Sequence, residues 1–201
     1  MKYRQYPGHP DYIITDLDQE FYQKHVQELL DFCDLEIGKN FYNSQNFPLH
    51  LNKSLKDGQN SSFVAISKET GNIVAMRLTY APGTWMREYR MGLSPHLWNV
   101  PSEHVACFKS LFIHQAHQQK GLGKILSNLA IDHLRKQGAM AIISHSSLGS
   151  PQNSSKKYLT SMGFLPLKEH PLFWQHIPYF CGHCSKSPCE CTALEMILYL
   201  E

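Results

Sequence analysis

The middle of the chain combines two short apolar runs with one amphipathic stretch. Residues 111–113 form an apolar run that leads into a polar loop with two glycines. Gly138 stands where a helix C-cap is expected, and residues 139–144 form a second apolar run of strand length. Between the two runs, apolar residues recur with a period close to 3.6, at Leu122, Ile125, Leu126, Leu129 and Leu134. The pattern predicts strand, helix and strand, a βαβ unit.

The residues before this unit predict helices followed by a hairpin. Residues 12–14 have the length of a short strand. N-cap candidates at residues 15–18, followed by apolar positions at helical spacing, predict a helix that stops at Gly38. A second short helix is expected over residues 48–55. Within residues 62–78, two apolar runs flank a polar turn that ends in glycine, which predicts a β-hairpin.

Residues 80–105 carry a weaker signal. Several prolines interrupt the segment, which also contains Trp85, Tyr89 and Trp98. Aromatic residues are scarce in disordered segments, so we expect an ordered loop. Its aromatic side chains either line a substrate pocket or hold the loop against the core.

The composition is that of a folded protein with one domain. The chain has 201 residues, 42% of them hydrophobic, and a formal net charge of +2. No basic run or basic helix face stands out, so we expect no nucleic-acid partner. No apolar run reaches membrane-spanning length and the N-terminus has no apolar signal segment, so we expect a cytoplasmic protein without membrane contact. We expect a monomer or a homodimer.

The two glycines of the central loop mark a place for an anion. Gly121 and Gly123 stand at the expected helix N-terminus, where the first backbone N–H groups lack intrahelical partners and the helix dipole is positive. Without a Cβ they allow a diphosphate to approach the backbone, and Lys120 and Lys124 add positive charge. The loop matches neither G-x-x-x-x-G-K-[ST] nor G-x-G-x-x-G. The alternative is an ordinary turn whose glycines only allow close packing.

The loop also has a family resemblance. Residues 118–123, Gln-Gln-Lys-Gly-Leu-Gly, resemble the [RQ]-x-x-G-x-[GA] segment of the GNAT superfamily of N-acetyltransferases, which holds the pyrophosphate of acetyl-CoA. Residues 111–114 look like the family's fourth strand, and residues 155–164 look like its helix ending in Gly-Phe. The resemblance implies an α/β fold with a mixed, mostly antiparallel sheet flanked by helices. It implies a single domain over residues 1–201, with a cysteine-rich insertion at 180–192.

The resemblance further implies how acetyl-CoA binds. A backbone N–H near Ile113 would donate to the thioester carbonyl, and the loop and helix N-terminus would hold the pyrophosphate. Asn153 fits the family's contact to the CoA arm. The implied cofactor-binding residues are Phe112, Ile113, Gln118, Gln119, Lys120, Gly121, Leu122, Gly123, Lys124 and Asn153.

The family's catalytic base does not map cleanly onto the chain. Its usual positions on the fourth strand hold Cys107 and Lys109, and an ordinary lysine is protonated at neutral pH. Glu103 and His104 lie just upstream and are the substitutes, acting through a water if necessary. A histidine has the ordinary pKa best suited to this role.

The catalytic acid is displaced as well. The family has a tyrosine four residues before the glycine of Gly-Phe, where this chain has Leu159, and the tyrosine stands one residue earlier, at Tyr158. One residue on a helix corresponds to a turn of about 100°. Tyr158 is the predicted acid if a local irregularity brings it to the thiolate. Otherwise it packs elsewhere.

A cluster of cysteines lies between two apolar runs near the C-terminus. Residues 172–177 and 194–200 look like the family's closing hairpin. The pattern between them is C-x2-C-x4-C-x-C, and four thiolates on a short loop can surround one tetrahedral Zn²⁺. His176 and His183 are spare ligands, and disulfides, an iron–sulfur cluster or an empty or oxidised loop are the alternatives. The predicted ligands of a structural zinc ion are Cys181, Cys184, Cys189 and Cys191.

Together these features predict an acyltransferase that moves the acetyl group of acetyl-CoA to a primary amine of a small molecule or a protein. A second hypothesis is a non-catalytic acyl-CoA-binding sensor whose cysteine loop responds to metal or redox state, because the family's acid and base positions hold other residues in this chain. A third is a zinc-dependent interaction module with no affinity for CoA. Turnover of acetyl-CoA with any amine separates the first from the other two.

Overall fold

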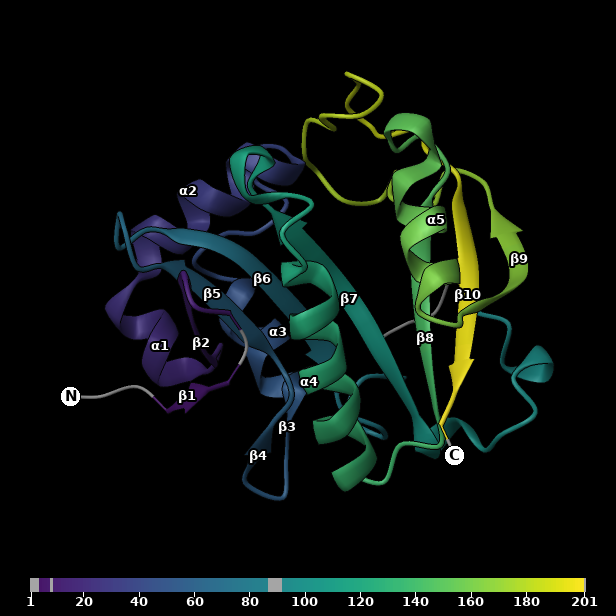
Figure 1. Ribbon diagram of the computed structural model, residues 1–201. Coiled ribbons are helices and arrows are strands. Elements are labelled where there is room, and N and C mark those ends of the chain that lie inside the picture. Colours follow the sequence, from purple (N-terminus) through teal and green to yellow (C-terminus); the bar gives the residue numbers. More distant parts are fainter. Residues whose placement is uncertain (1–3, 8, 87–91, 201) are drawn as a thin grey trace.

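The fold is built on one eight-stranded sheet (Figure 1). The computed structural model describes residues 4–7, 9–86 and 92–200. The strand order is β1-β2-β5-β6-β7-β8-β10-β9, and every neighbouring pair is antiparallel except β7 and β8. Helices cover both faces: one core contains side chains of α4 and α5, and another contains side chains of α1, α2 and α3. The mixed, mostly antiparallel α/β arrangement is confirmed.

The first half of the chain follows the sequence pattern with one interruption. Its elements are β1 (Gln5–Tyr6), β2 (Tyr12–Asp16), α1 (Gln19–Lys24), α2 (Val26–Ile37), α3 (Phe47–Ser54), β3 (Leu55–Lys56), β4 (Gln59–Asn60), β5 (Phe63–Ser67) and β6 (Ile73–Tyr80). Asp18 caps α1 by accepting a 2.8 Å hydrogen bond from the Phe21 N–H. The single helix expected up to Gly38 is wrong, because the backbone at His25 leaves helical geometry (φ −127°, ψ 27°) and divides it into α1 and α2.

The central βαβ unit is confirmed. It consists of β7 (Val105–Ile113), α4 (Leu122–Lys136) and β8 (Ala141–Ser147), with the short 3₁₀ turn η4 (Gln115–His117) between β7 and α4. β7 and β8 are parallel neighbours in the sheet, as a crossover helix requires. Gly138 follows α4 with φ 85°, the left-handed conformation expected after a helix.

The C-terminal hairpin has a different first strand from the expected one. The last elements are η5 (Pro151–Asn153), α5 (Ser154–Ser161), β9 (Leu165–His170) and β10 (Ala193–Tyr199). β10 pairs with β9, whereas residues 172–177 form turns. The expected strand at 172–177 is therefore wrong: Phe173 in this run packs on the His145 ring, with 4.2 Å between ring centroids.

The segment between β6 and β7 is ordered by its tryptophans. It contains η2 (Pro95–Leu97) and η3 (Ser102–His104), whereas Tyr89 lies outside the described residues. Trp85 and Trp98 are buried, and each indole N–H donates a hydrogen bond: to the Val105 carbonyl at 3.0 Å and to the Glu195 carboxylate at 2.8 Å. These two aromatics hold the loop against the core. Among the described residues, no helix has the length and hydropathy to cross a membrane.

Candidate functional site

The site begins where β7 and β8 separate. The two strands pair over four positions, from Val105 opposite Ala141 to Phe108 opposite Ser144. Ser110 then lies opposite Leu78 and Phe108 opposite Thr79, which leaves Lys109 as the extra residue of a β-bulge. Beyond this point β7 pairs with β6, and β8 pairs with β10. We call the separated segments, residues 109–113 of β7 and 145–147 of β8, the strand fork.

A row of unpaired backbone N–H groups lies directly after the β7 arm of the fork. The amides of residues 119–124 donate no hydrogen bond to any residue that the structure describes. They surround the N-terminus of α4, which has 15 residues and begins after Gly121 in the left-handed conformation (φ 80°). Six amides without partners among the described residues, at the positive end of a helix dipole, form a candidate anion site, which we call the cradle.

The two glycines of the cradle have different physical roles. A Cβ on Gly121 would meet no atom within 4 Å, so no protein atom packs where its side chain would stand. A Cβ on Gly123 would lie 3.2 Å from Ile113 Cδ1 and 3.3 Å from Tyr158 Cε2. Gly123 therefore lets α4 pack closely on β7 and α5, whereas Gly121 keeps the approach to the cradle open.

The other predicted cofactor-binding residues lie on the two arms of the fork and on the loop between β7 and α4. Gln118 turns back and donates a side-chain hydrogen bond of 3.1 Å to the Ile113 carbonyl, which joins the loop to the strand end. Phe112 is half-buried, and the exposed residues of the loop include both lysines. Asn153 is exposed at the start of α5 with φ 56°, and its N–H donates to the Ser150 carbonyl. The structure thus places the N-terminus of α5 after β8, on the other arm of the fork.

Tyr158 connects α5 to the cradle. Its hydroxyl donates to the Gly123 carbonyl at 2.8 Å and lies 2.6 Å from the Ser127 hydroxyl. Ser127 in turn accepts a 2.8 Å hydrogen bond from the Arg77 guanidinium. Leu159, at the family's position for the acid, is buried in the core. Of the two neighbours, Tyr158 is the one that reaches α4.

Arg77 is a buried cation with no carboxylate partner among the described residues. It is 2% exposed, its guanidinium stacks 4.2 Å from the centre of the Phe108 ring, and its Nε has no hydrogen-bond partner in the described chain. Burial lowers the pKa of its guanidinium. A desolvated charge is costly, so this position indicates a role beyond packing.

Glu103 and His104 are not brought to the cradle. His104 lies at the far end of α4, where its Nδ1 is 3.2 Å from the Gly138 carbonyl oxygen. Nine residues separate His104 from Ile113 along an extended strand, a distance of about 30 Å. This separation removes both residues from chemistry beside Ile113.

Sequence reasoning missed a group of polar side chains beside the fork. Tyr42 and Ser110 share a 2.6 Å hydrogen bond, and His50 Nδ1 lies 2.6 Å from the Tyr80 hydroxyl. Burial, assisted by the charges of nearby lysines, lowers the pKa of His50 to about 3. His145, the first β8 residue of the fork, binds the Gly92 carbonyl, and burial lowers its pKa to about 4. These residues come from separate elements, so no local motif could have identified them.

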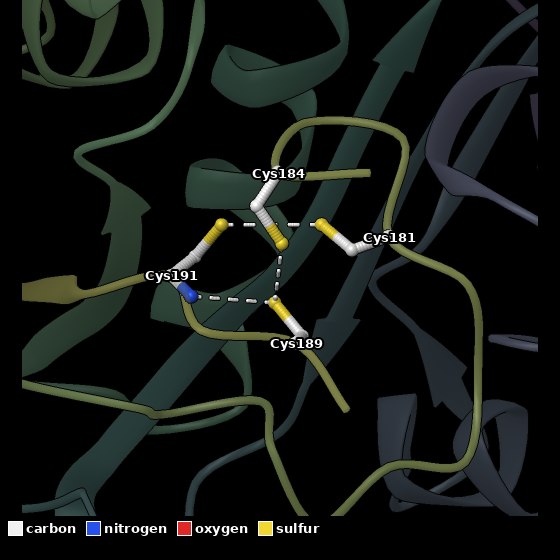
Figure 2. A group of neighbouring side chains, drawn as sticks. All are labelled: Cys181, Cys184, Cys189 and Cys191. Atoms are coloured by element: carbon white, nitrogen blue, oxygen red, sulfur yellow. Dashed lines mark hydrogen bonds between the residues drawn. The ribbon is translucent and has the colours of Figure 1, made fainter. Parts of the chain in front are cut away.

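The four clustered cysteines converge on one point (Figure 2). Their Sγ atoms all lie within 4.8 Å of one another, with 3.9 Å between Cys181 and Cys191 and 3.9 Å between Cys184 and Cys189. Tetrahedral Zn²⁺ with Zn–S bonds of about 2.3 Å requires sulfurs about 3.8 Å apart. All six cysteines are free thiols in this structure, and neither spare histidine belongs to the group.

The surroundings of the cluster favour thiolate at one member. Burial would raise the pKa of the Cys181 thiol, but the N–H groups of Cys184 and His183 and the Tyr179 hydroxyl lower it to about 6. Burial raises the pKa of Cys189 and Cys191. Backbone N–H groups that point at sulfur stabilise negative charge, which a thiolate ligand of a metal carries.

The chain belongs to the GNAT acetyltransferase family, because the model of the acetyltransferase (GNAT) family matches residues 16–164. Enzymes of this family use acetyl-CoA as co-substrate. A comparison with curated proteins by sequence gives no significant match.

Solved structures share the fold at low sequence identity. One is the NatC complex bound to Gag peptide and CoA, with a TM-score of 0.67, 14% identity, and coverage of 95% of this chain and 99% of that one. Another is yncA, a putative acetyltransferase from Salmonella typhimurium with acetyl-CoA, at TM-score 0.60 and 20% identity over 95% of each chain. The ribosomal-protein-S18-alanine N-acetyltransferase from Escherichia coli has a TM-score of 0.60 and 13% identity over 94% of each.

Proposed function

We propose that the protein transfers the acetyl group of acetyl-CoA to a primary amine, with the pyrophosphate in the cradle and the thioester in the strand fork. The single observation that carries this proposal is the row of amides 119–124, which follow the β7 arm and have no partners in the part of the chain that the structure describes. The cradle supplies donors for a diphosphate, and the separated strands leave the backbone of Phe112 and Ile113 beside the path of the pantetheine arm.

Acetyl transfer requires a group that stabilises the oxyanion and an acid for the leaving thiolate. The neutral amine nitrogen attacks the thioester carbonyl carbon, the C–S bond breaks, and the amine loses a proton to water. A backbone N–H near Ile113 stabilises the developing oxyanion. Tyr158, whose ring flanks Gly123 together with the Ile113 side chain, is the proposed acid that protonates the CoA thiolate once its hydroxyl turns from the Gly123 carbonyl. Glu103 and His104 have no part in this step because of their distance from Ile113.

The test compares two glycines that flank the same helix. Gly121 and Gly138 both have positive φ, and a Cβ on either would meet no atom within 4 Å. Gly121→Val and Gly138→Val therefore carry a similar backbone strain, but only the first places methyl groups at the cradle. We expect Gly121→Val to weaken acetyl-CoA binding at least tenfold by titration calorimetry, and Gly138→Val to bind as the unmodified protein does. Equal affinity in both variants would refute the cradle.

The acceptor is a primary amine of unassigned type. Two of the structural neighbours are named for a bound peptide and for an alanine of a ribosomal protein, so an amine screen should contain peptide N-termini beside lysine peptides and small amines. Release of free CoA thiol with any of these amines supports the enzyme. Binding of acetyl-CoA without turnover across the screen would support the sensor hypothesis.

We also propose that the four-cysteine cluster binds one structural Zn²⁺. The sulfur spacing fits tetrahedral coordination, and four thiolates fill the shell without a histidine. A closed shell has no open position for a substrate, so the ion would supply cross-linking of the loop rather than Lewis-acid chemistry.

A further inference from the structure

One side of the cysteine loop is fixed to the end of α2. A Cβ on Gly38 would lie 2.1 Å from the Phe180 carbonyl oxygen, so the two backbones are in direct contact. The Gly182 N–H donates to the Ile37 carbonyl at 3.4 Å. The Tyr179 ring packs edge-on against Phe41, with 4.9 Å between ring centroids. The loop segment that carries Cys181 and Cys184 therefore moves with the end of α2.

The other side of the loop is fixed to the end of β8. The Leu148 N–H donates to the Thr192 carbonyl at 3.0 Å, immediately beyond β8. A Cβ on Gly149 would lie 3.4 Å from Cys191 Sγ, so this sulfur packs on the same turn. Thr192 leads directly into β10, which pairs with β8 along its whole length. The segment that carries Cys191 therefore moves with the β8 arm.

The α2 side of the loop also reaches the β7 arm of the fork. Lys109, the bulge residue, has its Nζ 5.6 Å from the centre of the Phe41 ring. The next residue of β7, Ser110, bonds to the Tyr42 hydroxyl at 2.6 Å. Figure 1 shows the loop between β9 and β10 reaching from the β10 side of the molecule toward α2. The four sulfurs thus lie between two bodies, each attached to a different arm of the fork.

We propose that the metal site is a brace across the strand fork. This inference rests on the zinc ion proposed above. A metal bound to Cys181 and Cys184 on one side and to Cys191 on the other fixes the spacing between the β7 and β8 arms, where β7 and β8 do not pair with each other. Without the metal, thiols in van der Waals contact hold the two sides together less rigidly. Metal occupancy therefore controls acetyl-CoA affinity from outside the cofactor site.

The first experiment compares a variant that lacks one cysteine ligand with a variant of a neighbouring residue that is not a ligand. Cys184 is the half-exposed member of the cluster, so Cys184→Ser loses a ligand with little loss of buried contact. His183→Ala changes an exposed side chain on the same loop and keeps all four sulfurs. We expect about one zinc per chain by elemental analysis in the unmodified protein and in His183→Ala, and at least a tenfold lower content in Cys184→Ser. Full zinc in Cys184→Ser would overturn the four-thiolate site itself.

The second measurement tests the brace. We expect hydrogen exchange in Cys184→Ser to accelerate at least tenfold at residues 37–42, 109–113 and 145–149, while residues 130–134 of α4, which pack in the other core, keep their rate. Acetyl-CoA affinity should fall about tenfold. Treating the unmodified protein with a zinc chelator should reproduce both changes, and added Zn²⁺ should reverse them. Zinc loss without faster exchange at the fork would refute the brace and leave the zinc site standing.

Discussion

At the scale of single residues, Tyr158 is held by a directed chain of hydrogen bonds. The Arg77 guanidinium donates to Ser127, Ser127 donates to Tyr158, and Tyr158 donates to the Gly123 carbonyl. The chain begins at a buried charge that has no carboxylate partner among the described residues and ends at the cradle. A protein that needed only packing here would be as stable with an apolar residue at position 77. The arrangement is therefore suited to positioning the Tyr158 hydroxyl.

Replacement of Tyr158 by Phe separates catalysis from binding. We expect Tyr158→Phe to lower the acetylation rate about 10- to 100-fold, because the thiolate leaves without its acid. The acetyl-CoA dissociation constant should change less than threefold, and the free energy of unfolding should fall by about 1 kcal/mol for the lost hydrogen bonds. Tyr199→Phe, at an exposed position on β10, serves as the control. An unchanged rate in Tyr158→Phe would leave the tyrosine a structural role only.

At the scale of elements, the junction between α2 and the cysteine loop depends on one glycine. Gly38 ends α2 with φ 119°, and a methyl group there would overlap the Phe180 carbonyl oxygen. Neither the helix end nor the loop can shift alone, because the Gly182 N–H binds Ile37 on the same turn. A substitution that displaces the end of α2 is therefore expected to displace the cysteine loop as well.

Alanine at Gly38 should disrupt this junction more than alanine at a turn glycine does. We expect Gly38→Ala to lower the free energy of unfolding by about 3 kcal/mol, from a strained φ and a backbone overlap. Gly71→Ala also has a positive φ, but at 76° it is nearer the left-handed helical region than Gly38 at 119°, and open space surrounds its Cβ, so it should cost about 1 kcal/mol. Urea denaturation of both variants measures the difference. Equal losses would show that the loop moves away from α2 at little cost.

The elements also differ in how well the sequence alone could predict them. Periodicity reports which face of an element is buried, so the βαβ unit around α4 and the β5–β6 hairpin were predictable. β9 is an edge strand whose residues are mostly exposed, so it carries no alternation, and the apolar run at 172–177 was read as a strand in its place. The cradle was predictable because its residues are contiguous. The polar groups beside the fork were not, because contacts such as Tyr42 to Ser110 join distant parts of the chain.

At the scale of the whole molecule, buried neutral histidines link folding to pH. The pKa of His50 is lowered to about 3 and that of His145 to about 4, both chiefly by burial. In the unfolded chain a histidine has a pKa of about 6.5. Between these values the unfolded state binds more protons than the folded state, so the free energy of unfolding falls as the pH falls below 6.5. Both imidazoles lie beside the fork, and their protonation is expected to unfold the site with the sheet around it.

Substitution of His50 isolates one of these contributions. Between pH 7 and pH 5, a histidine that stays neutral in the folded state costs up to about 2 kcal/mol of stability. His50→Asn keeps a polar atom near the Tyr80 hydroxyl. Between pH 7 and pH 5, we expect its free energy of unfolding to fall by about 1 to 2 kcal/mol less than that of the unmodified protein. Urea titrations at both pH values measure the difference. His96→Asn, at an exposed position, should follow the unmodified protein, because its side chain reaches water in both states. A pH dependence that is identical in all three proteins would mean that His50 takes up a proton as readily in the folded state as in the unfolded chain.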